Sequence, residues 1–145
     1  MGPRRLGGDA GAATTELVIV TPAFLFLILL TIQSGLYFHA VSVASAAAQD
    51  GARTAAVGGT GAARAAGEQE AEQLMQDLAS DLVVGADATA SSVDGGQMVR
   101  MAVTGDVVEV FVVPGVPISL AINESAESAV ERFRPAGDIP TDTSP

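Results

Sequence analysis

The sequence predicts an α+β protein in which a long N-terminal transmembrane helix continues beyond the membrane. An amphipathic helix packed on a small antiparallel sheet follows it. Three patterns predict this architecture: an apolar run over residues 17–38, a helical apolar stripe over residues 71–82, and alternating apolar positions over residues 99–103. Of the 145 residues, the membrane segment leaves roughly 80–95 for one small domain with a thin core.

The apolar run Leu17–Phe38 has the length of a membrane span. Its 22 residues form about 33 Å of helix, against a hydrocarbon core of about 30 Å. Arg4 and Arg5 precede the run, which favours a cytoplasmic N-terminus. A cleavable signal peptide is the rival interpretation, because small-residue cleavage patterns occur over residues 44–48. The run is too long for that, and the candidate cleavage sites lie well beyond its end.

Two residues of this N-terminal region, a glutamate and a proline, are unusual in a membrane-spanning helix. Glu16 is the last charged residue before the apolar run, and a carboxylate at the bilayer centre costs roughly 2.5–3.5 kcal/mol. Glu16 either rests among lipid headgroups or takes part in assembly. Pro22 lies two turns into the run, where it removes one backbone hydrogen bond and predicts a helix kink.

The helix is expected to continue to about Val57, because the residues after the span are rich in alanine and other helix-forming small residues. Ala44, Ala48 and Ala52 are spaced for close helix packing, although an alanine-rich composition also produces this spacing by chance. The glycine-rich segment 58–61 ends the helix.

The outer domain starts with a second helix, expected over residues 62–83. Its predicted buried stripe is Ala71, Leu74, Met75, Leu78 and Leu82. Strand-like alternation follows, with Asp94-Gly95-Gly96 as a hairpin turn and Gly105-Asp106 as an interruption before a valine-rich stretch over 107–113. Further alternation at Ile118, Leu120 and Ile122 completes a sheet of three or four strands. The segment 135–145 has the composition of a disordered tail.

Composition argues against several classes of function. The net charge is −10, which does not suit a nucleic-acid-binding protein. There is no cysteine and a single histidine, His39, at the end of the span. No nucleophile and base can be combined into a catalytic set. We therefore expect no enzyme activity, no cofactor, no metal and no small-molecule substrate.

The chain resembles the TadE-like family, minor pseudopilins of the Tad/Flp (type IVb) pilus assembly system. Four features carry the resemblance: an arginine-bearing leader ending in Gly11 with Glu16 fifth after it, an early Thr21-Pro22, an exit stretch over 45–53 that ends in Gly51-Ala52-Arg53, and a C-terminal Pro114-Gly115-Val116-Pro117-Ile118 leading to residues 129–133.

The resemblance implies a pilin-like subunit of the inner (cytoplasmic) membrane with its C-terminal domain outside. It implies processing by a prepilin peptidase between Gly11 and Ala12, and an assembly role for Glu16 toward the new amine of a neighbouring subunit. Other pilins, pseudopilins and pilus platform proteins are the implied partners. The expected division is a leader over 1–11, a helix over 12–57, an extracytoplasmic domain over 58–134 and the tail. The alternative is a single-pass envelope protein whose outer domain is an unrelated protein- or wall-binding module.

Overall fold

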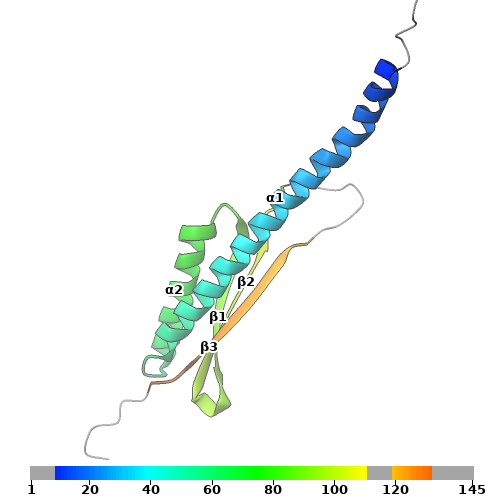
Figure 1. Ribbon diagram of the computed structural model, residues 1–145. Helices are drawn as coiled ribbons and strands as arrows, with labels where there is room; N and C mark the ends of the chain where they lie inside the picture. Colours follow the sequence, from blue (N-terminus) through cyan, green and yellow to red (C-terminus); the bar gives the residue numbers. More distant parts are fainter. Residues whose placement is uncertain (1–8, 111–118, 132–145) are drawn as a thin grey trace, which may run out of the picture.

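The computed structural model describes residues 9–110 and 119–131, with side chains from Thr14 onward. Its elements are the helices α1 (Asp9–Ala56) and α2 (Gly61–Ala79), the strand β1 (Val83–Val93), the short 3₁₀ turn η1 (Asp94–Gly96), and the strands β2 (Met98–Val107) and β3 (Ala121–Ala129). The α+β class is confirmed: two helices accompany one antiparallel sheet of three strands in the order β1-β2-β3. The N-terminal half of α1 projects away from the rest of the protein (Figure 1).

The C-terminal half of α1 packs through its smallest residues. Its buried face is almost entirely alanine, with one valine: Ala40, Val43, Ala44, Ala47, Ala48, Ala52, Ala55 and Ala56. Because these side chains are small, neighbouring elements can approach the helix axis closely. The predicted small-residue packing of Ala44, Ala48 and Ala52 therefore occurs within the chain, against α2 and the sheet.

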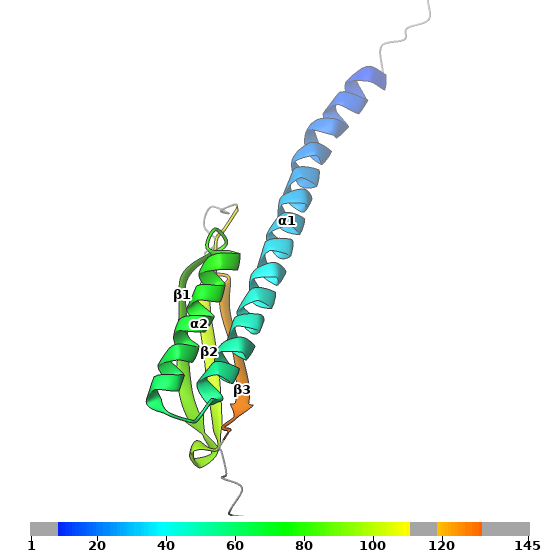
Figure 2. The ribbon, with the colours of Figure 1, turned by 90° about the vertical axis from the view of Figure 1, so that its left-hand side faces the viewer.

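A tight turn reverses the chain between α1 and α2. Gly58 and Gly59 adopt left-handed φ angles of 74° and 61°, which glycine reaches without steric cost. Thr60 caps α2 by accepting a hydrogen bond from the Ala63 N–H at 3.1 Å. The two helices consequently lie side by side (Figure 2).

Two details expected of the second helix are wrong. The helix ends at Ala79, because Val83 already pairs with Val107 in the sheet. Leu78, expected in the buried stripe, is 55% exposed. Ala71 and Met75 are buried as expected, and Gly67 and Ala79 complete the buried row. These four positions are spaced at every fourth residue, so they lie on one face of the helix, and Leu78 lies outside that face.

The sheet follows the expected hairpin but not the expected interruption. Asp94, Gly95 and Gly96 turn the chain with φ angles of 53°, 64° and 85°, and Val93 pairs with Met98 across the turn. Gly105-Asp106 does not interrupt the strand, because both residues pair with β3. The irregularity lies on β1, between Val84 and Asp87.

Both helices cover the same face of the sheet (Figure 2). Sequence patterns predicted one covering helix, but α1 packs on β2 and β3 while α2 packs mainly on β1. The largest fully buried side chains lie between these layers: Met75, Met101, Val99 and Val103.

The valine-rich stretch expected over 107–113 does not continue the strand. β2 ends at Val107, and residues 108–110 are not in a strand. The remainder of that stretch, Ile118 and the tail over 135–145 lie outside the described residues.

Candidate membrane anchor and assembly surface

The projecting half of α1 presents apolar side chains on every side. All sixteen residues from Leu17 to Ile32 are exposed, and α1 contains a candidate membrane span with a mean hydropathy of 2.3. The hydroxyl of Thr31 donates to the Leu27 carbonyl at 2.8 Å, and that of Ser34 donates to the Leu30 carbonyl at 2.8 Å. These polar groups are satisfied within the helix, as a lipid environment requires.

Pro22 lies inside α1, which is one continuous helix from Asp9 to Ala56. A proline has no N–H, so the carbonyl of Val18 receives no hydrogen bond from position 22. The kink expected at Pro22 stays a prediction.

The residues singled out for processing and assembly all lie near the start of α1. Gly11 and Ala12 are the third and fourth residues of the helix, in the turn whose N–H groups have no helical acceptors. Glu16 is exposed one residue before the apolar run. Because a helix places residues four apart on one face, Ala12 and Glu16 lie one turn apart on the same side.

Gln33 is the first residue of α1 that the outer domain covers, and it is only 8% exposed. Its side-chain amide donates to the Val108 carbonyl at 3.3 Å, and its amide oxygen accepts from the Val110 N–H at 2.8 Å. One glutamine thus holds the chain beyond β2 against the helix. This role was missed: an isolated polar residue late in an apolar run signals a special position but not its partner, which lies 75 residues away.

Replacing Gln33 by leucine is expected to release this contact. Two backbone groups lose their partner, and an unsatisfied buried group costs about 1–3 kcal/mol. Amide hydrogen exchange of the full chain in micelles should show faster exchange at Val110. Gln49→Leu is the matched control, because Gln49 is exposed on α1 and its side chain donates to the Ser45 hydroxyl one turn earlier at 3.4 Å. Unchanged protection of Val110 in Gln33→Leu would contradict the contact.

The two helices approach most closely at a pair of glycines. A Cβ added at Gly51 would lie 2.7 Å from the Gly67 carbonyl oxygen, and one at Gly67 would collide with the Gly51 carbonyl oxygen and lie 2.7 Å from the Ala55 Cβ. Gly51 belongs to the Gly-Ala-Arg stretch noted in the sequence, and the structure gives it a packing reason. Gly67 was missed, although a glycine between helix-forming residues is a recognisable signal of close packing.

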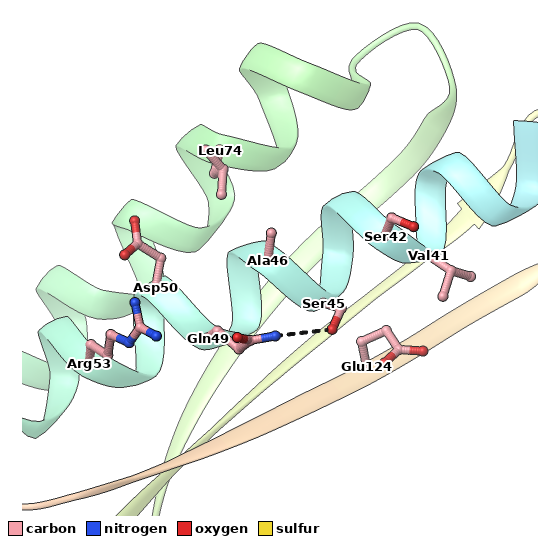
Figure 3. Close-up of a pocket in the computed structure, with 9 residues that line it drawn as sticks. All are labelled: Val41, Ser42, Ser45, Ala46, Gln49, Asp50, Arg53, Leu74 and Glu124. Atoms are coloured by element: carbon pink, nitrogen blue, oxygen red, sulfur yellow. Dashed lines mark hydrogen bonds between the residues drawn. The ribbon is translucent and has the colours of Figure 1, made fainter.

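A shallow groove of about 640 Å³ runs along the exposed face of α1, between α2 and β3. α1 contributes most of the groove, Leu74 lies on the α2 side, and Glu124 lies on β3 (Figure 3). The complete lining is Val41, Ser42, Ser45, Ala46, Gln49, Asp50, Arg53, Leu74 and Glu124. The lining carries both signs of charge and two hydroxyls beside apolar side chains.

Among the described residues, no three His, Cys, Asp or Glu side chains are grouped closely enough to hold a metal ion. The single histidine, His39, is exposed on α1.

These features define a single-helix candidate membrane protein with a small α+β domain beside its span. A scan against protein-family models finds a TadE-like protein over residues 11–53, so the resemblance to that family is confirmed for this segment. The match indicates a protein associated with Tad pilus systems. Comparisons with curated proteins and with solved structures return no match.

Proposed function

We propose that this protein is a non-enzymatic TadE-like minor pseudopilin that acts in the assembly of a Tad/Flp-type pilus or a related secretion apparatus. One observation carries the proposal: the family segment, residues 11–53, lies entirely within α1, Asp9–Ala56. The part of the chain that resembles the family is therefore the anchoring helix. In this proposal α1 crosses the inner membrane once, with the N-terminus in the cytoplasm and the sheet domain outside.

The position of Gly11 supports processing by a prepilin peptidase between Gly11 and Ala12. A bond in the first turn of a helix opens at low cost, because the N–H groups there make no helical hydrogen bonds. Cleavage would create a cationic amine at Ala12, one helical turn from Glu16 of the same chain.

The position of Glu16 supports its role in assembly. It is exposed, next to sixteen exposed residues (17–32) of which all but Thr21 and Thr31 are apolar. Once subunits pack side by side, lipid and protein would shield a carboxylate at that boundary from bulk water, so its attraction to the amine of a neighbouring trimmed subunit would be screened less than in water. We propose that this ion pair selects the register between adjacent helices.

The groove supports a second contact with pilus components. Of its nine lining residues, all but Leu74 and Glu124 fall within the matched segment 11–53. The part of α1 that lines the groove between α2 and β3 therefore belongs to the family segment.

We expect the protein extracted from cell membranes to begin at Ala12, as measured by intact mass. Loss of residues 1–11 removes two arginines and one aspartate, so the formal side-chain charge becomes −11 instead of −10. Changing Gly11 to a bulky residue such as leucine should leave the leader attached. Gly8→Leu, three residues upstream, is the matched control and should be processed normally.

The same membrane extracts distinguish the proposed pseudopilin from the alternative, a single-pass envelope protein with an unrelated binding module. Pilus platform proteins should co-purify with the trimmed protein after mild cross-linking. A full-length chain with no pilus component attached would contradict the proposal, and a chain beginning at Ala47 or Gln49 would indicate secretion of the outer domain instead.

A further inference from the structure

A corner of the outer domain lies beside the membrane end of α1. It comprises Val108–Val110, the residues directly after β2, and is called the membrane-side corner below. Val108 and Val110 are 41% and 46% exposed. Gln33 bonds the backbone of both of them, immediately after the exposed apolar run of α1, so their exposed side chains lie next to the apolar surface of the helix.

Three of the six backbone polar groups of this corner are paired within the protein. The Val108 N–H donates to the Leu82 carbonyl at 2.8 Å, and Gln33 occupies both the Val108 carbonyl and the Val110 N–H. Non-helical backbone survives near hydrocarbon only where its polar groups are paired within the protein. The corner meets this condition at three of its backbone groups.

The length of the exposed run places the corner relative to the bilayer. Leu17–Ile32 spans only about 24 Å as a helix, whereas crossing the hydrocarbon core takes about 20 residues. Glu16 marks the N-terminal end of the run, so the missing residues come from Gln33 onward. Twenty residues counted from Leu17 end at Leu36, about one helical turn beyond Gln33, so the corner lies close to the hydrocarbon boundary.

Glu109 limits how deep the corner can go. Its side chain is exposed between the two valines, and an unpaired carboxylate is costly inside hydrocarbon but not among headgroups. Two valines flanking one carboxylate match the interfacial zone, where apolar and hydrated groups coexist.

We infer that the membrane-side corner inserts into the lipid interface and gives the protein a second contact with the bilayer, beside the span itself. The occupant of this surface is lipid. The inference rests on the proposed function only in requiring that α1 cross a membrane. Because α1 and the membrane-side corner both contact the bilayer, the sheet domain would keep a fixed tilt relative to the membrane plane.

Single tryptophans test this directly, because the chain contains none. The full-length protein is reconstituted in phosphatidylcholine vesicles that carry a quencher at shallow or deep acyl positions. Val110→Trp probes the corner. Leu25→Trp, at a 55% exposed position of the apolar run, is the positive control. Gln97→Trp, exposed beyond the hairpin turn at the opposite end of β2, is the negative control.

We expect Val110→Trp to emit at shorter wavelength than Gln97→Trp and to be quenched more by the shallow than by the deep quencher, because an interfacial aromatic lies at the headgroup level. Leu25→Trp should respond more to the deep quencher. Quenching of Val110→Trp no greater than that of Gln97→Trp, with Leu25→Trp quenched, overturns the inference and leaves the proposed function standing. If Leu25→Trp is not quenched either, the membrane span itself is wrong and both fail.

Discussion

Replacing Glu16 by alanine is expected to abolish partner capture while leaving membrane insertion intact. Insertion should be normal or better, because a charge is removed from the edge of the apolar run. Losing one member of a shielded ion pair leaves the other charge unpaired, at a cost of about 3 kcal/mol or more. That corresponds to about a hundredfold weaker association. The measurement is the yield of cross-linked or co-purified pilus components per amount of membrane-inserted protein.

The control for Glu16→Ala is Glu70→Ala. Glu70 is an exposed carboxylate of α2, so this variant makes the same change in net charge far from the membrane helix. It should capture partners as the unmodified protein does. Equal capture by Glu16→Ala and Glu70→Ala would show that Glu16 is an ordinary interfacial residue, and the proposed register role would be withdrawn.

Replacing Gly67 by alanine is expected to destabilise the outer domain by about 1–3 kcal/mol, and replacing it by valine by more. Alanine normally stabilises a helix relative to glycine by up to about 1 kcal/mol. Here the added Cβ meets backbone, the Gly51 carbonyl and the Ala55 N at 2.9 Å, which cannot move aside like a flexible side chain. α2 must therefore shift away from α1 and loosen the contacts of Met75.

Denaturant unfolding of the full chain in micelles, followed by the circular dichroism of the sheet and helices, measures this effect. Gly61→Ala is the matched control: it lies in the same helix, with no atom within 4 Å of its added Cβ. It should be neutral or slightly stabilising. A Gly67→Ala variant as stable as Gly61→Ala would show that the helices separate without cost at this crossing.

Local patterns predicted the elements whose signals lie within a few residues of one another. The apolar run, the end of α1 near the glycines at 58 and 59, and the Asp94-Gly95-Gly96 turn all depend on local composition and backbone preference. Three of the four features that carried the family resemblance lie in or next to the segment that the family model matches, residues 11–53, and the C-terminal feature lies outside it. Such signals need no knowledge of distant contacts.

The errors came from contacts between distant segments. Leu78 matches a helical stripe as well as Met75 does, but the face that is buried was decided by the close approach of α1. Gly105 appears to break a strand in isolation, yet it pairs with Ile122 of β3. Lacking a side chain, it leaves room for Val83, whose Cγ1 would lie 2.6 Å from an added Cβ.

Hydrophobic periodicity and run length were enough to predict a membrane-length apolar helix and an α+β outer domain, because both act locally; the resemblance to the TadE-like family came from short motifs. The contact of Gln33 with Val108 and Val110, and the close approach of Gly51 to Gly67, became visible only in the folded chain. Both are pairings between segments far apart in the chain. Neither residue type nor spacing indicates which distant backbone a glutamine or a glycine will meet.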